Sequence, residues 1–281
     1  MTDKDRFMTF LRTLFLLTSL LFSALSGTPL FASPEQDNIL NTIQKKGEIT
    51  VGVTLLAPWI MKNKEGKLIG FEIDIANQLA SDMGVRVRFR QYPWNQLIPA
   101  LKKGDIDIIA SGLSITPKRA LEVDFSTPYA SSGYGLVSNL NLTKDFTSIK
   151  DLNSKKVYIA AVRGTVSADL ARRTFPAATI DLRKTAKDAT SAVVNGSVHA
   201  FISSSPVPEF IALKNPHDVD LPLKKPLLTT KEAFAIRKGN QGMLNFLNAW
   251  IIAHDADRWI SSSHSYWFNS LKWQTRISEG K

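Results

Sequence analysis

One arginine stands where its guanidinium could hold an anion. Arg119 closes the run Thr116-Pro117-Lys118-Arg119, just past a predicted strand and in the first turn of a predicted helix. A cation in that turn opposes the helix dipole, so the position is unfavourable unless an anion lies beside it. Because a guanidinium presents a planar fork of N–H donors, it matches a carboxylate with two parallel hydrogen bonds. We therefore expect Arg119 to hold a carboxylate; the alternative is an ordinary surface arginine.

A second candidate anion site lies in the later half of the chain, where Gly164 and Thr165 open a predicted helix. Exposed amide groups at a helix start, with a hydroxyl beside them, attract an anion. The alternative is simple N-capping by Thr165 or Ser167. Both can hold at once, because one hydroxyl can cap while free amides face a ligand.

The composition excludes several kinds of chemistry. The chain has no cysteine, so disulfides, a thiol nucleophile, iron–sulfur clusters and cysteine-based zinc sites are excluded. The four histidines are scattered without metal-ligand spacing: His199, His217, His254 and His264. No serine–histidine–acid set can be recognised either. We expect no metal and no cofactor, and the scattered basic residues do not indicate nucleic-acid binding.

The N-terminus reads as an export signal over residues 1–32. Its positive start is made by Lys4, Arg6 and Arg12. The apolar run Thr13–Leu25 that follows is short of the roughly 20 residues of a membrane helix. Cleavage fits after Ser26 or Ala32, an uncleaved anchor being the alternative, and without a cysteine no lipid anchor is expected. The remaining residues hold 32 basic and 23 acidic side chains, a net charge of +9 that favours anionic ligands.

Predicted strands and helices alternate in two stretches of the chain. The first comprises strand 49–53, helix 73–83, strand 85–89, helix 94–101 and strand 106–110. The second comprises strand 156–160, helix 167–173, strand 179–182, helix 186–194, strand 198–202, helix 207–213 and strand 232–237, before helices 241–253 and 257–268. This alternation predicts α/β layers with mostly parallel sheets. Ligands of such sheets bind beyond the carboxyl ends of the strands, which draws attention to the loops after Val53 and Ala110.

Seven short motifs occur along the chain in an order that is typical of a known protein family. The set is Gly70-Phe71-Glu72-Ile73-Asp74, Trp94-Asn95-Gln96-Leu97, Gly104-Asp105-Ile106-Asp107, Ser111-Gly112-Leu113-Ser114-Ile115-Thr116-Pro117-Lys118-Arg119, Phe125-Ser126-Thr127-Pro128-Tyr129, Arg163-Gly164-Thr165, and Ala235-Ile236-Arg237-Lys238-Gly239-Asn240. Over about residues 36–272 the chain resembles the polar amino-acid-binding branch of bacterial periplasmic solute-binding proteins, family 3. Each motif is weak alone, but seven in order are specific.

The resemblance implies an α/β fold of two Rossmann-like lobes joined by a two-strand hinge, the type II periplasmic binding protein fold. Lobe 1 would comprise residues 36–130 plus 235–281, and lobe 2 residues 138–228. The hinge strands would lie at about 130–138 and 229–235, and the lobes would close over the ligand. The implied function is capture of a small carboxylate or amino acid in the periplasm. The ligand would be delivered to an ABC permease in the inner membrane, with no nucleic acid involved and the protein a monomer.

The resemblance also implies roles for individual residues. The carbonyl at the Gly112 position takes an amine in that family, and the hydroxyl at the Ser114 position helps bind the carboxylate together with Arg119 and the Gly164–Thr165 pair. Trp94 would form a wall of the pocket, although core packing is an equal alternative. Leu56, in the loop after the first strand, is also a candidate ligand contact. Four further features are interpreted as structural or left undecided: Asp74 and Asp107 as structural, Tyr266-Trp267-Phe268 as a packing cluster, and Trp59 as either pocket mouth or core.

The expected partner for a ligand ammonium group is missing from its usual place. Ser204 occupies the position where amino-acid binders carry an acid, and the loop after the first strand lacks the acid that some members have. Neutral acceptors alone would lose a charge-assisted bond worth about 1.5–3 kcal/mol. Either the ligand has no ammonium group, or an acid such as Glu232 or Glu209 replaces the usual one. The sequence therefore favours a carboxylate or a modified amino acid.

Two other functions fit parts of the pattern. A periplasmic dehydratase acting on cyclohexadienyl substrates shares the fold and several motifs, but it needs a general acid in the cleft. Glu209 falls two residues past that position, which on a helix turns its side chain well away. An extracellular ligand sensor is the third interpretation, and it would require a separate signalling partner.

Overall fold

The computed structural model describes residues 8, 39–269 and 273. The predicted export signal and both of its cleavage points lie outside the described residues, Met8 apart. Among the residues described, no helix is both long and apolar enough to cross a bilayer.

The first sheet has five strands in the order β4-β1-β5-β13-β6. Its strands are β1 (Glu48–Val53), β4 (Arg86–Gln91), β5 (Ile108–Ile109), β6 (Asp124–Phe125) and β13 (Ala235–Ile236). It is accompanied by α2 (Ile39–Lys46), the hairpin β2 (Met61–Lys62) and β3 (Leu68–Ile69), α3 (Phe71–Asp82), η1 (Trp94–Gln96), α4 (Leu97–Lys103), α5 (Pro117–Ala120), α10 (Gln241–Ala256) and α11 (Trp259–Phe268). Strand β1 pairs in parallel with β4 and β5, whereas β13 pairs antiparallel with β5 and β6. The alternating strands and helices thus produce the expected parallel core, and a late segment completes the sheet.

The second sheet has the order β11-β7-β10-β8-β9, with β12 paired to β7. Its strands are β7 (Ala130–Asn139), β8 (Tyr158–Val162), β9 (Thr179–Arg183), β10 (Ala200–Ser204), β11 (Val219–Asp220) and β12 (Leu228–Glu232). Its helices are α6 (Leu140–Thr143), η2 (Ile149–Leu152), α7 (Val166–Thr174), α8 (Ala186–Val194) and α9 (Val207–Lys214). Strands β8, β9 and β10 are mutually parallel, and β7 runs antiparallel to β10 and β12.

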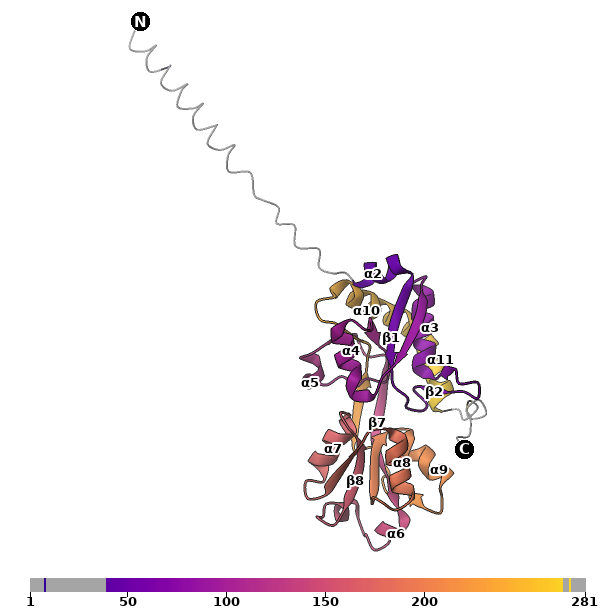
Figure 1. Cartoon of the computed structure of the whole chain (residues 1–281), viewed down its shortest axis with the longest axis vertical. Coiled ribbons are helices and arrows are strands. Elements are labelled where there is room, and N and C mark those ends of the chain that lie inside the picture. The colour runs from indigo at the N-terminus through magenta and orange to yellow at the C-terminus, as the bar shows by residue number, and fades with distance from the viewer. Residues whose placement is uncertain (1–7, 9–38, 270–272, 274–281) are drawn as a thin grey trace. The chain divides into compact units, whose positions relative to one another are not determined.

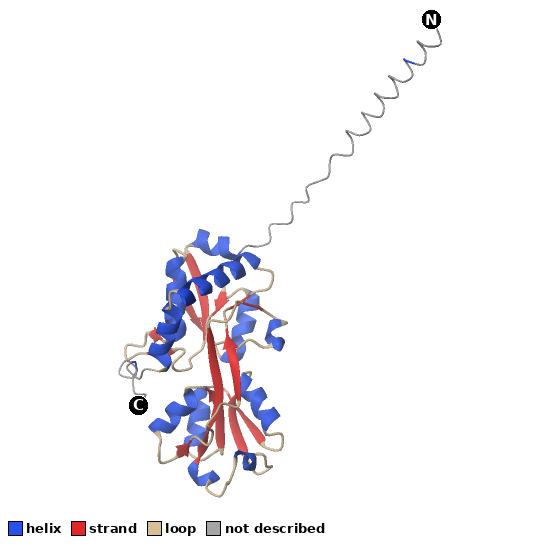
Figure 2. Ribbon diagram, turned by 180° about the vertical axis from the view of Figure 1, so that it is seen from behind, coloured by secondary structure: helices blue, strands red, loops and turns tan. Residues whose placement is uncertain are grey.

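Helices cover both faces of each sheet, as Figure 2 shows. In β10, Ala200 and Ile202 belong to one core cluster of the second sheet, while Phe201 between them belongs to another. Successive side chains of a strand point to opposite faces, so both faces of this sheet are buried. This double burial explains why the central strands read as continuous apolar runs in the sequence.

Two paired strands connect the sheets. Strand β7 runs on from the segment after β6 into the second sheet, and β12 returns toward β13 (Figure 1). They pair antiparallel from Ala130↔Glu232 to Tyr134↔Leu228. The chain therefore passes between its two sheets through a short two-stranded ribbon.

Most predicted elements are found within a few residues of their predicted positions, and α8 has the predicted bounds. The single strand predicted over 232–237 is wrong: β12 ends at Glu232, and β13 at Ala235–Ile236 lies in the other sheet. Antiparallel pairing is also more extensive than predicted, because β7, β12 and β13 reverse direction relative to the strands beside them.

Four structural interpretations from the sequence can be followed in the fold. The Asp74 carboxylate accepts a hydrogen bond of 2.6 Å from the Trp267 indole, and the Asp107 carboxylate accepts one of 2.8 Å from the Thr50 amide. Both acids are structural, as predicted, and Trp267 packs in the core of the first sheet. Trp59 is 1% exposed in the same core. Of its two alternatives, pocket mouth or core, the core is therefore the right one.

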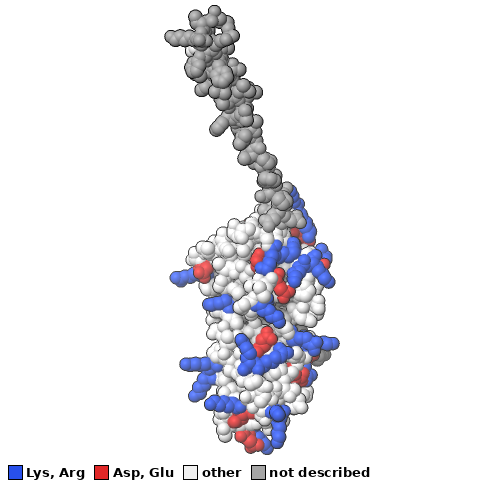
Figure 3. All heavy atoms as spheres, turned by 90° about the vertical axis from the view of Figure 1, so that its left-hand side faces the viewer, with Lys and Arg blue, Asp and Glu red and all other residues white. Residues whose placement is uncertain are grey.

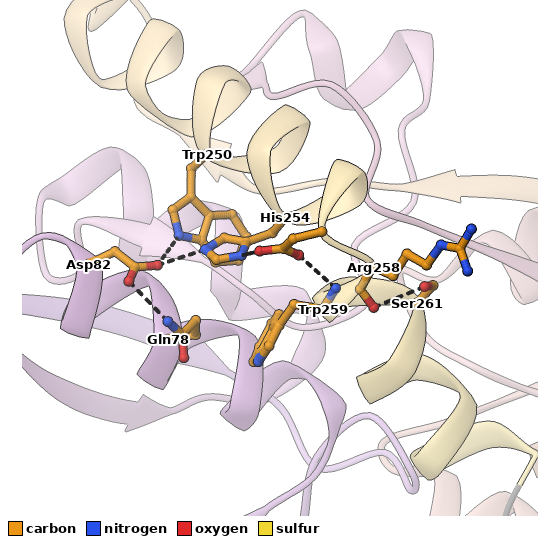
Figure 4. A network of polar contacts seen from close by, with 8 residues as sticks. Gln78, Asp82, Trp250, His254, Arg258, Trp259 and Ser261 are labelled. Atoms are coloured by element: carbon orange, nitrogen blue, oxygen red, sulfur yellow. Dashed lines mark hydrogen bonds and ion pairs between the residues drawn. The ribbon is translucent and has the colours of Figure 1, made fainter.

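A polar network fastens α10 to α3 and to the corner before α11 (Figure 4). The His254 ring lies 2.8 Å from an Asp82 carboxylate oxygen and 2.9 Å from one of Asp257. The Asp82 carboxylate also accepts from Trp250 and Gln78. Burial alone would lower the pKa of His254, but the hydrogen bonds with Asp82 and Asp257 outweigh burial and raise it.

Replacing His254 with glutamine should destabilise the protein by about 0.5–1 kcal/mol at pH 5.5, and by less at pH 8.5. The raised pKa means that the stabilisation is fully present below the unfolded value and is lost as the pH rises through the folded value. Urea unfolding of both proteins at the two pH values measures it. The exposed His217→Gln variant is the control, and a difference that does not change with pH contradicts the prediction.

Candidate functional site

A cavity of about 1360 Å³ lies where the first sheet's loops, β12 and the β8–α7 turn meet. It is lined by Trp94 of η1, by residues 115–119 before and within α5, by Thr230 of β12, and by Gly164 with Val166 of the turn. Three of the predicted site residues, Trp94, Arg119 and Gly164, are therefore brought together. The loops concerned follow strand ends, as the rule for parallel sheets predicts.

The residues just before Arg119 determine where the short helix α5, which carries it, begins. The Thr116 side chain caps α5 by accepting from the Arg119 amide at 3.2 Å, and Pro117 begins the helix. The Arg119 side chain is only 8% exposed, and burial lowers the pKa of its guanidinium. It remains charged at neutral pH because an arginine pKa lies so far above 7. A buried cation without a carboxylate partner among the described residues is costly unless an anion joins it.

The guanidinium is held by carbonyl oxygens on both sides of the cavity. It donates to the Ser114 carbonyl at 2.8 Å and to the Gly164 carbonyl at 3.3 Å. The Trp94 indole N–H also donates to the Gly164 carbonyl at 3.1 Å, and the guanidinium lies over the Trp94 ring at 5.6 Å from its centroid. A guanidinium has five N–H donors, so these contacts orient Arg119 and leave donors for a ligand carboxylate.

The hydroxyls of two predicted site residues, Thr165 and Ser114, make hydrogen bonds within the protein. Thr165 caps α7: its side-chain oxygen accepts from the Ala168 amide and donates to the Val162 carbonyl at 2.7 Å. Thr165 thus has the capping role, one of its two compatible roles, and its neighbours Gly164 and Val166 line the cavity. Ser114 is 1% exposed, and its hydroxyl lies within hydrogen-bond distance of Tyr134, Thr230 and Glu232. Ser114 reaches Arg119 through its backbone carbonyl.

Glu232 is the centre of that hydroxyl cluster. One carboxylate oxygen accepts from Thr230 at 2.6 Å, from Ser132 at 2.7 Å and from Ser114 at 3.2 Å. The other oxygen is buried without a hydrogen-bond partner among the described residues. Burial raises the pKa of this carboxyl although the hydroxyl bonds oppose the shift. Thr230 lines the cavity and donates to Glu232, which is not itself a lining residue.

Gly112 occupies a backbone position that needs glycine. Its φ is +61°, and a Cβ there would lie 2.9 Å from the Trp59 ring. Its amide donates to Glu72 at 2.6 Å, and the Tyr129 hydroxyl donates to the same carboxylate at 2.8 Å. Burial raises the pKa of Glu72 to about 7 although these bonds oppose it. Glu72 and Tyr129 were not recognised from the sequence; the available signal was that Glu72 stands between the apolar residues Phe71 and Ile73 at the start of α3.

The remaining candidates are not among the residues that line the Arg119 cavity. Ser204 is 7% exposed and pairs with Tyr134 across β10 and β7. Leu56 lines a separate cavity of about 360 Å³ together with Val207 and Phe210. The exposed Glu209 accepts from the Ser205 hydroxyl at 2.9 Å.

Comparison with known proteins agrees with this fold. Residues 49–270 match the family described as bacterial extracellular solute-binding proteins, family 3. The L-cystine-binding protein TcyJ of Escherichia coli K12 is 27% identical over 244 residues, covering 83% of this chain and 87% of the relative. A putative ABC transporter binding component from Wolinella succinogenes, solved with lysine, is 32% identical with a TM-score of 0.76, covering 82% and 99% of the two chains.

A second solved structure bears on the enzyme alternative. The ancestral amino-acid-binding protein AncCDT-1, described as a precursor of cyclohexadienyl dehydratase, is 34% identical with a TM-score of 0.75. It covers 82% of this chain and 99% of its own length. The match to the family spans most of the chain, so this protein is a member of family 3 of the bacterial extracellular solute-binding proteins.

Proposed function

We propose that this protein captures a small carboxylate-bearing solute at Arg119 and delivers it to an ABC importer. The observation that carries the proposal is a buried guanidinium, 8% exposed, facing a cavity between segments of both sheets. Relatives named for binding cystine, glutamine and arginine support an amino acid or a related organic acid as the solute. The export signal over residues 1–32 would place the protein in the periplasm.

We further propose that the site closes by hinge motion. Lobe 1 would be residues 36–130 plus 235–281, lobe 2 residues 138–228, with the hinge near 130–138 and 229–235. The two-stranded ribbon of β7 and β12 supports this division, because the described part of the chain passes between the sheets only there. The Gly164 carbonyl, which accepts from both Arg119 and Trp94, would be the contact that a bound carboxylate strengthens on closure.

Binding rather than turnover is the proposed activity. Two carboxylates line the Arg119 cavity, and both have cationic partners: Glu122 lies 3.0 Å from Lys102, and Asp169 lies 3.3 Å from Arg172. Glu209, the nearest acid to the dehydratase position, lines neither cavity described above. A general acid must reach the reacting group, so these placements favour a binding protein.

The test compares carboxylates with their amides in a thermal-unfolding screen. A carboxylate at 100 times its Kd should stabilise the protein by about 2.7 kcal/mol, which corresponds to a rise in Tm of roughly 5–10 °C. The matching amide lacks the charge and should produce little shift. Equal shifts for acid and amide would contradict the proposal, as would conversion of a cyclohexadienyl acid to a new product by the same protein.

A further inference from the structure

The cavity around Arg119 is lined by far more positive than negative charge. Its cationic side chains are Lys118, Arg119, Arg163, Arg172, Arg173 and Lys231. Its carboxylates are Glu122 and Asp169. Six cations against two anions leave a net lining charge of +4.

The two carboxylates neutralise little of this charge. Asp169 lies 3.3 Å from Arg172, one of the six lining cations. Glu122 is paired at 3.0 Å with Lys102, which does not line the cavity. The other five lining cations have no ion pair with a carboxylate among the described residues.

The charges have a layered arrangement. Arg119 is buried within the cavity, whereas the other five cations are exposed. Arg163 directly precedes Gly164, whose carbonyl lies 3.3 Å from the Arg119 guanidinium, and both Arg163 and Gly164 line the cavity. Figure 3, which faces the side on which α5 and α7 lie, shows basic side chains predominating over acidic ones there.

This charge distribution is a poor match for a cationic solute. Like charges lining a cleft raise the local potential, which repels an ammonium or guanidinium group and attracts a second anion. The solved relative from Wolinella succinogenes holds lysine, whose side chain is positive. The lining described here offers such a side chain no unpaired carboxylate, and Glu232 is not a lining residue.

We infer that the natural solute is a small organic molecule with two anionic groups. One carboxylate would be held at Arg119, and a second anionic group, either carboxylate or phosphate, would lie beside Arg163 and the first turns of α7, where Arg173 also lines the cavity. This inference rests on the proposed function and narrows its substrate class.

Calorimetry with a matched pair of probes tests the inference. Succinate carries two negative charges at pH 7, and succinamate has the same length with one. Succinate should bind at least about tenfold more tightly. The probe 3-phosphoglycerate distinguishes the two forms of the second group, since tighter binding than succinate indicates a phosphate.

Variants locate the second charge. The double variant Arg163→Gln/Arg173→Gln should weaken succinate binding about tenfold and change succinamate binding by less than about twofold. Both side chains are exposed, so we expect the variant to fold, which its Tm verifies. Arg86→Gln, on the β4 edge with a side chain 82% exposed, is the matched control and should leave both affinities unchanged.

The solute that co-purifies with the protein gives an independent measurement. Released by denaturation and identified by mass spectrometry, it should carry two or more negative groups. A singly charged or cationic solute, or succinamate binding as tightly as succinate, overturns the inference but leaves a carboxylate-binding protein. Failure of every carboxylate to bind, with a co-purified solute that has no carboxylate, overturns the proposed function itself.

Discussion

Replacing Arg119 with alanine should weaken binding of the carboxylate solute by at least about 100-fold. Removing one partner of a buried, hydrogen-bonded charge pair costs about 2–5 kcal/mol, and 2.7 kcal/mol corresponds to 100-fold in Kd. The loss is large because the guanidinium is buried and its orientation is fixed by the Ser114 and Gly164 carbonyls. Titration calorimetry on the wild type and the variant measures it directly.

The fold should survive this substitution. The cap of α5 uses the Arg119 backbone amide and the Thr116 side chain, and alanine retains that amide. Arg119→Lys should give an intermediate affinity, because it keeps the charge but loses the two-pronged geometry. Arg86→Ala, at an exposed position of β4, is the control. A Kd for Arg119→Ala within threefold of the wild-type value would mean that the carboxylate is bound elsewhere.

The fold could be predicted well where local signals agree with tertiary structure. Helix α8 has the predicted bounds because Thr185 and Asp188 form a capping box and apolar residues follow at helical spacing. Strand β7 was expected only from the resemblance, as a hinge strand at about 130–138, because Ala130–Asn139 contains serine and glycine and no clear alternation. The strand forms because β10, β11 and β12 all pair with it, which no local pattern reveals.

The candidate site could be predicted only in part, for a similar reason. Trp94, Arg119 and Gly164 line one cavity because each follows a strand end or opens a helix, and such places converge in α/β folds. Ser114 and Thr165 were predicted from the same kind of position, and their hydroxyls make hydrogen bonds to protein groups that the sequence did not indicate. For Ser114 that partner is Glu232, 118 residues away, so the competition cannot be read locally.

Glu72 provides the second large expected effect, a dependence of stability on pH. Burial raises the pKa of Glu72 to about 7 in the folded protein, whereas the ordinary pKa of a glutamate carboxyl is 4.5. Between these values the folded state binds more protons than the unfolded state, so the free energy of unfolding falls as the pH rises. The shift corresponds to about 3 kcal/mol, lost between pH 4.5 and 7 and fully absent above that range.

Glu72→Gln should remove this part of the pH dependence. The glutamine carbonyl can still accept from the Gly112 amide, and its NH₂ group can donate to the Tyr129 hydroxyl, as a protonated carboxyl would. At pH 8 the variant should therefore be more stable than the wild type by about 2–3 kcal/mol, whereas at pH 5 the two should be similar. Urea unfolding from pH 5 to 8 measures the difference, and Glu65→Gln, in an exposed turn, is the control.

Measuring solute affinity in the Glu72 variants distinguishes an effect on stability from an effect on the binding site. Glu72→Gln keeps the bond that holds Gly112, so the loop leading to Ser114 and Arg119 should retain its shape and the solute its affinity. Glu72→Ala removes the acceptor for both Gly112 and Tyr129, and each buried donor left unpaired costs about 1–3 kcal/mol. The alanine variant should therefore lose stability at every pH. If the glutamine variant kept the wild-type pH dependence, the buried carboxyl of Glu72 would not be the group that titrates near pH 7.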